Sequence, residues 1–160
     1  MNTKKVMIIM VILLASGLGL LLSGHPATAA TPVVTVSGGG RATFDPGEEM
    51  EGFETKFSVG AQLREDGTAG GHFNCLIEGV VVITGDVLSG QMNPDGSVTL
   101  EGLATIVDLE FGIFRNEPFM VIMEAGGPGE GHFVYFDAVT GPAGDAETVS
   151  HGQIMINTHE

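Results

Sequence analysis

The chain has 160 residues, of which 20 are acidic and six are basic, and its formal net charge is −14. Because a polyanion repels phosphate backbones and anionic lipid head groups, this charge argues against nucleic acid and anionic membrane surfaces as partners. A hydrophobic content of 43% with 16% charged residues is too apolar for a disordered acidic chain, so we expect a folded domain.

Residues 1–30 have the pattern of a secretory signal peptide. Two lysines precede an uncharged apolar run over 6–22, and small residues follow up to Ala29 and Ala30. We therefore expect cleavage near Ala29-Ala30, a secreted or extracytoplasmic location at the cell surface or in the periplasm, and a single domain over 31–160. An uncleaved N-terminal anchor is the alternative, because the apolar run reaches the short edge of a membrane span.

Alternation of apolar and polar residues predicts strands in the rest of the chain, where no sustained helical periodicity occurs. Every second residue from Phe53 to Leu63 is apolar or threonine, so this face is expected in the core. Residues 98–107 repeat the pattern. Asp-Gly pairs at 66–67 and 95–96 predict tight turns, because glycine supplies the positive φ that such turns need.

Short sequence words recur about 60 residues apart, which predicts an internal repeat. Gly71-His72-Phe73 reappears as Gly131-His132-Phe133. We expect two pseudo-repeats, about 33–88 and 97–157, because each holds four predicted strands. Eight antiparallel strands predict an all-β fold that closes into a small β-barrel, with a β-sandwich as the alternative. The expected strands are 33–44, 53–64, 70–78, 80–88, 97–107, 117–125, 131–138 and 147–157.

Glycine-rich and alternating motifs are spread over most of the chain after residue 30. They are Gly38-Gly39-Gly40, Ala42-Thr43-Phe44, Phe57-Ser58-Val59, Gly71-His72-Phe73 and Gly152-Gln153-Ile154-Met155-Ile156. As a set they resemble a poorly characterised family of bacterial secreted and cell-surface Gly-rich β domains. The resemblance implies an exported bacterial β module and supplies no catalytic residue.

The sequence matches none of the catalytic templates that we compared with it. Cys75 is the single cysteine, so no intrachain disulfide can form, and its apolar neighbours predict a buried, inert thiol. His72 lies three residues before it on the same strand and therefore on the opposite face, which excludes a local Cys–His pair. Gly-x-Ser-x-Gly and His-Glu-x-x-His motifs are absent from the sequence. The three glycines at 38–40 predict a turn or bulge between two short strands rather than an anion-binding nest.

Histidines form the strongest metal-binding hypothesis. His72 and His132 occupy equivalent places in the two pseudo-repeats, and His151 is the third candidate. Alternation directs the first two outward on different sides of a barrel, so we expect no metal site and no cofactor. The acidic segments 45–49 and 137–147 lack the regularly spaced ligands of a calcium loop.

The leading hypothesis is a secreted, non-catalytic β-barrel module that acts by binding or as a cell-surface component. One alternative is a carrier of a small apolar ligand inside the barrel, and another is a cofactor-independent barrel isomerase or cyclase. Tyr135, His72 and His132 are the candidate ligand-binding residues, and the expected partner is a small apolar ligand or another surface protein. An interior filled by Phe and Val favours the module, an empty apolar cavity the carrier, and an occluded carboxylate or Tyr135 in a cavity the enzyme.

Overall fold

The computed structural model describes residues 32–48, 50–139 and 144–159. These residues form eight antiparallel strands joined by turns and loops. The predicted signal peptide lies outside the described residues. Within the described ranges, no helix is long and apolar enough to cross a membrane. The strands are β1 (Pro32–Phe44), β2 (Glu54–Arg64), β3 (Thr68–Ile77), β4 (Val81–Met92), β5 (Val98–Asp108), β6 (Gly112–Glu124), β7 (His132–Asp137) and β8 (Asp145–Thr158).

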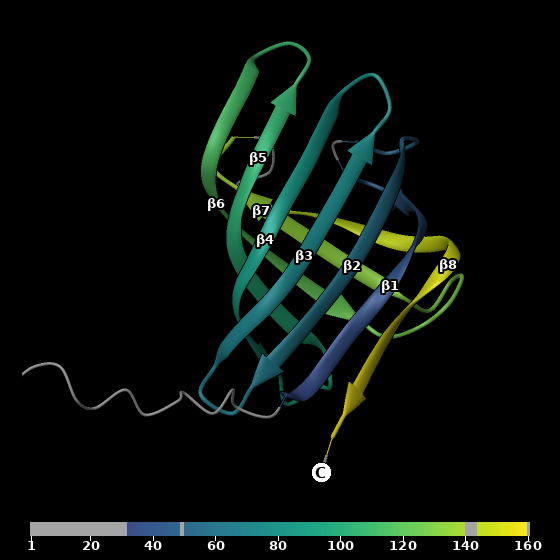
Figure 1. Ribbon diagram of the computed structural model, residues 1–160. Helices are drawn as coiled ribbons and strands as arrows, with labels where there is room; N and C mark the ends of the chain where they lie inside the picture. The colour runs from purple at the N-terminus through teal and green to yellow at the C-terminus, as the bar shows by residue number, and fades with distance from the viewer. Residues whose placement is uncertain (1–31, 49, 140–143, 160) are drawn as a thin grey trace, which may run out of the picture.

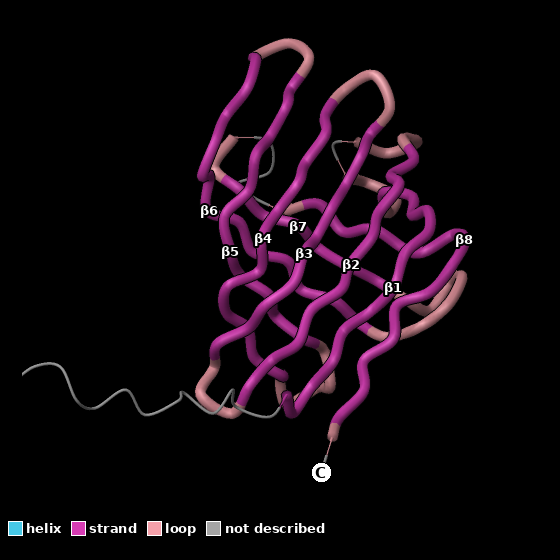
Figure 2. Tube along the Cα trace, viewed as in Figure 1, coloured by secondary structure: helices cyan, strands magenta, loops and turns pink. Residues whose placement is uncertain are grey.

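Each strand pairs with the next one along the chain, and β8 pairs with β1, so the sheet closes into a barrel (Figure 1, Figure 2). The predicted all-β barrel is therefore confirmed, and the sandwich alternative is wrong. Closure leaves every strand with two hydrogen-bonded neighbours and removes the exposed edges that a sandwich would have.

The predicted strands agree with the observed ones to within a few residues, with two exceptions. The strand β4 ends later than expected and β6 begins earlier, and the β5–β6 and β3–β4 hairpins both rise above the rest of the barrel at the upper end in Figure 1. Phe53, predicted to face the core, is 44% exposed because β2 begins one residue later, at Glu54.

The glycines at 38–40 do not interrupt a strand, so the expected strand over 33–44 is confirmed and the predicted turn or bulge at these glycines is wrong. They lie inside β1 and pair with both β2 and β8. A Cβ atom on Gly40, whose φ is +154°, would lie 1.9 Å from the carbonyl oxygen of His151. Glycine is needed there because β8 passes too close to β1 for any side chain.

An aromatic cluster fills the middle of the barrel. The ring centroids of its contacting pairs lie 5.0 to 6.1 Å apart, within the range of favourable aromatic contacts. The inward positions predicted by alternation for Phe57, Phe73 and Phe133 are confirmed, since all three are buried. The members of the cluster are Phe57, Phe73, Phe119, Phe133 and Tyr135.

Both predicted Asp-Gly turns are present. Gly67 and Gly96 have positive φ values of 81° and 90°. In each turn the aspartate side chain accepts a hydrogen bond from the backbone N–H two residues later, at 2.9 Å for Asp66 and 3.0 Å for Asp95. Hydrogen bonding of this kind is what favours aspartate at such positions.

Candidate functional site

A cavity of about 180 Å³ opens at the end of the barrel where the β3–β4 and β5–β6 turns lie. This end cavity lies beyond the aromatic cluster and shares Tyr135 with it. Most of its wall is apolar, and the polar part consists of five titratable residues. The apolar residues are Phe44, Met50, Ile77, Val80, Val81, Ile83, Phe111 and Val139; the titratable ones are Cys75, Asp108, Tyr135, Asp145 and Glu147.

A second hollow, of about 670 Å³, lies open to solvent over β4, β5, β6 and β7. It is larger, but we favour the end cavity as the candidate site. Three buried side-chain polar atoms of the described residues lack a hydrogen bond: Thr55 Oγ1, Tyr135 Oη and Glu147 Oε2. Two of these three belong to residues that line the end cavity, and buried polar groups without partners are uncommon in folded proteins.

Glu147 lies near the start of β8, and its side chain is inside the barrel. On each of the two neighbouring strands its pairing partner is an aromatic residue. Glu147 is opposite Phe44 on β1 and Phe133 on β7, and only 2% of its surface is exposed. Its inward direction depends on a bulge farther along β8. The pairing with β1 skips Ser150, and this extra residue reverses which residues of β8 face the interior.

The surroundings of Glu147 favour its neutral form. The pKa of its carboxyl group is raised to about 8, and burial is the largest cause. The negative charges of Asp145 and Asp45 also raise this pKa, whereas the nearby Thr55 hydroxyl lowers it in part. The Thr55 hydroxyl does not reach hydrogen-bond geometry, since its Oγ1 and the Glu147 Oε2 both lack a partner among the described residues. At neutral pH the carboxyl group is therefore mostly protonated.

Tyr135 lines the cavity and carries a buried hydroxyl group on a fixed ring. The ring stacks on Phe73 at 5.7 Å and on Phe119 at 6.0 Å, and the side chain is buried. Burial first, and then the Asp137 carboxylate, through its charge and as a nearby hydrogen-bond acceptor, raises the pKa of the phenol above its usual range, although the Tyr135 Oη has no partner in full hydrogen-bond geometry among the described residues. The hydroxyl group therefore stays protonated and is available to a ligand as both hydrogen-bond donor and acceptor.

Cys75 is buried, as predicted, and it lies in the cavity wall, which was not predicted. Burial is the main cause that raises the pKa of its thiol well above the usual value, and the charges of Glu147 and Asp137 add to it. A thiol that stays protonated is a poor nucleophile, so these surroundings favour an inert side chain.

The predicted candidates His72 and His132 do not lie in the cavity with Tyr135. His72 is exposed on β3, where its ring covers Gly60. His132 is half-buried, and its Nδ1 lies 3.0 Å from the hydroxyl of Thr148 on β8. Among the residues that the structure describes, no group of three or more His, Cys, Asp or Glu side chains is placed to hold a metal ion.

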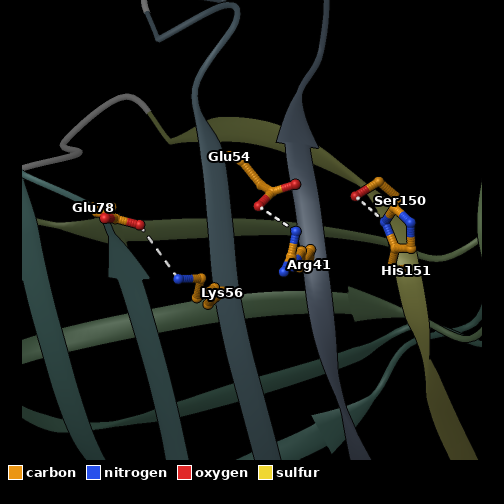
Figure 3. Close-up of polar contacts among 6 residues, drawn as sticks. All are labelled: Arg41, Glu54, Lys56, Glu78, Ser150 and His151. Carbon is orange, nitrogen blue, oxygen red and sulfur yellow. Dashed lines mark hydrogen bonds and ion pairs between the residues drawn. The ribbon is translucent and has the colours of Figure 1, made fainter.

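Two of the basic side chains are held in ion pairs, one between β1 and β2 and one between β2 and the β3–β4 turn. Arg41 lies 3.3 Å from Glu54, and Lys56 lies 3.4 Å from Glu78 (Figure 3). The side chains of both basic residues are about half exposed, so these pairs belong to the outer surface of the barrel.

Sequence reasoning did not predict Glu147 as a site residue. The signal was present in the short alternation of Glu147 with Val149, an apolar residue two positions later. Both residues point inward because of the bulge at Ser150. A strict alternation of inward and outward residues does not allow for such an extra residue, so it assigns them to the wrong face.

Comparisons of the chain with protein-family models, curated proteins and solved structures found no match. The resemblance to bacterial Gly-rich β domains therefore stays a prediction. What the site can do follows from its chemistry: it combines an apolar wall with three protic side chains, Glu147, Tyr135 and Cys75.

Proposed function

We propose that this protein is an exported binding module that holds one small, mostly apolar ligand in the end cavity. The observation that carries the proposal is the pair of buried atoms without hydrogen bonds, Glu147 Oε2 and Tyr135 Oη, on residues that line an apolar space. Leaving such an atom unpaired costs about 1–3 kcal/mol. A ligand that bonds to them recovers part of this free energy on binding.

The size of the cavity sets the size of the ligand. An apolar protein cavity of about 150 Å³ accepts benzene. A volume of about 180 Å³ therefore suits one six-membered ring with a short polar substituent. The aromatic side chains that fill the middle of the barrel support the hypothesis of a non-catalytic module. The cavity at the end of the barrel supports the hypothesis of a carrier, so the proposal combines these two hypotheses.

A panel of ring-sized compounds, observed by the NMR shifts of the protein, tests the proposal. Val81→Phe fills the cavity from β4, whereas Val82→Phe adds the same side chain at a position that is 40% exposed. We expect binding to be lost in the first variant and kept in the second. Equal binding to both variants would place the ligand elsewhere and overturn the proposal.

Export is part of the proposal, supported by the signal-like pattern of residues 1–30. We expect protein recovered from outside the cytoplasm to begin at Ala30 or Thr31. Intact mass spectrometry of that material measures its first residue. Recovery of the whole chain in a membrane fraction would support the anchored alternative instead.

A second candidate function is proton transfer in a cofactor-independent isomerase or cyclase. The observation that favours it is a buried carboxyl group with a pKa of about 8, since general acids and bases act best when their pKa lies near the working pH. The Glu147 carboxylate would take a proton from the carbon next to a ketone, and Tyr135 would donate a hydrogen bond to the enolate oxygen. Returning the proton to a different carbon would complete the isomerisation.

Incorporation of solvent deuterium into cyclohexanone tests this second function. We expect exchange that depends on the native protein, is abolished by Glu147→Gln and is slowed roughly 100-fold by Tyr135→Phe. Glu54→Gln, on the outer surface, is the control and should exchange like the parent protein. Exchange that survives Glu147→Gln would exclude this function.

A further inference from the structure

The titratable carboxyl groups at the end cavity have only acidic titratable neighbours in the described part of the chain. Asp108 and Asp145 line it together with the mostly neutral Glu147, and Asp45 lies close enough to affect the Glu147 carboxyl. Among the described lining residues there is no lysine, arginine or histidine. An anionic ligand would therefore be repelled, whereas a cation would be attracted from solution.

None of the four basic residues that the structure describes lines the cavity. Arg41 and Lys56 are paired on the outer surface (Figure 3), and Arg64 contacts Thr68 beside the β2–β3 turn. Arg115 is exposed on β6, opposite Thr105 of β5. The buried carboxyl of Glu147 thus has no cationic side chain near it in the described structure, although it has one oxygen free to accept a hydrogen bond.

We propose that the end cavity binds a small primary amine as its ammonium cation, with the ammonium group between Glu147 and Tyr135. The inference rests on the proposed ligand-binding function and specifies the ligand class. An ammonium group has three N–H donors, and the free Glu147 Oε2 and Tyr135 Oη can accept two of them. The apolar body of the amine then lies against Ile77, Val81 and Ile83.

Binding of the cation changes the protonation of the site. The free protein holds Glu147 mainly as the neutral acid at neutral pH. When the ammonium enters, the carboxyl becomes a carboxylate and its proton passes to the solvent, so cation uptake is matched by proton release. The other titratable groups around it are Asp45 after β1, Cys75 on β3, Asp108 on β5, Tyr135 and Asp137 on β7, and Asp145 on β8.

Three compounds that share a benzene ring provide the test: benzylamine, benzyl alcohol and benzoate. Their binding to the purified protein is measured by isothermal titration calorimetry at pH 7, in two buffers with different ionisation enthalpies. We expect benzylamine to bind roughly tenfold tighter than benzyl alcohol or more, and benzoate to bind weakest. The heat difference between the buffers should correspond to about one proton released per benzylamine bound.

Glu147→Gln keeps the shape of the side chain and removes its charge. We expect the preference for benzylamine and the proton release to disappear, while the affinity for benzyl alcohol stays within about twofold. Glu54→Gln, which removes a carboxylate from the outer surface, should leave all three affinities and the proton release as in the parent protein.

The outcomes separate this inference from the proposed function. Equal binding of benzyl alcohol and benzylamine, or a preference for benzylamine that survives Glu147→Gln, would overturn the amine inference and leave the ligand-binding cavity in place. Failure of all three compounds and of the neutral panel to bind, in protein with a native NMR spectrum, would overturn the proposed function itself.

Discussion

The rings of Phe57 and Phe133 meet inside the barrel, with their centroids 5.0 Å apart and their planes tilted by 49°. The two residues belong to β2 and β7, which are not hydrogen-bonded to each other, so the contact crosses the barrel interior. Phe73 on β3 meets Phe133 edge-on at 6.1 Å. These contacts tie together strands that the hydrogen-bonded ladder does not join, and they make the aromatic cluster the centre of the core.

Truncation of either ring should therefore strongly lower the stability of the fold. We expect Phe57→Ala and Phe133→Ala to lower the free energy of unfolding by about 3–5 kcal/mol each, because each leaves a cavity in a close-packed core. Glu54→Ala and Lys56→Ala, on the outer surface of β2, should stay within about 0.5 kcal/mol of the parent. Urea unfolding measures all four.

The double variant measures the ring contact itself. Its loss of stability should differ from the sum of the two single losses by about 0.5–1.5 kcal/mol, the contribution of an aromatic pair beyond its buried area. Unfolding free energies that overlap between the core and surface variants would contradict the assignment of the two faces of β2.

The strands and their faces could be predicted from sequence because a period of two is a local property. The inward set Phe57, Phe73 and Phe133 follows from it directly. Phe53 was assigned wrongly because alternation does not indicate where a strand begins. Gly38 to Gly40 were assigned wrongly because glycine marks a turn and a close approach between strands equally well.

The cavity could not be predicted in the same way, because it is the space that side chains from six different strands fail to fill. Its key carboxyl shows the difficulty. Counting back from the buried Ile154 by twos places Glu147 on the outer face, but the bulged residue Ser150 shifts the count by one. Bulges depend on how the two strands pair, which one strand's sequence does not specify. Tyr135 lies on β7, away from this bulge, and alternation identified it correctly as an inward polar residue.

Gly71 occupies a position where a side chain cannot fit. Its φ is +149°, and a Cβ atom there would lie 2.0 Å from the carbonyl oxygen of Gly60 on β2. We expect Gly71→Val to lower the free energy of unfolding by roughly 3 kcal/mol or more, through backbone strain and separation of the strands. Gly70→Ala is the matched control, because its Cβ would meet only the end of the Arg64 side chain, at 3.9 Å. Similar losses in the two variants would contradict the steric explanation.

The histidine of each Gly-His-Phe motif should contribute much less to the stability of the fold than the glycine or the phenylalanine. We expect His72→Ala to change the free energy of unfolding by about 0.5 kcal/mol, since its ring is exposed. His132→Ala should cost about 1 kcal/mol, because it also removes the contact with the Thr148 hydroxyl. Phe73→Ala should cost about 3–5 kcal/mol. A tightly bound metal that both histidine variants lose would contradict this assignment of the histidines to the outer surface.

Glu147 should make the stability of the protein depend on pH in a particular window. The pKa of its carboxyl is about 8 in the folded protein, compared with an ordinary glutamate value of 4.5. Between these two values the unfolded chain gives up a proton that the folded protein keeps. The contribution of Glu147 to stability is therefore fully present below pH 4.5 and is lost as the pH rises to about 8.

Glu147→Gln isolates this contribution, because the amide stays neutral at every pH. We expect the variant and the parent to have similar free energies of unfolding at pH 4.5, and the variant to be more stable at pH 8 by a few kcal/mol, on the order of 3. Urea unfolding at several pH values gives the two curves, and Glu54→Gln should follow the parent curve throughout. Parallel curves for Glu147→Gln and the parent would mean that the carboxyl ionises in the folded protein at an ordinary pH. The cavity would then be hydrated, and the amine inference would lose the desolvated carboxylate on which it depends.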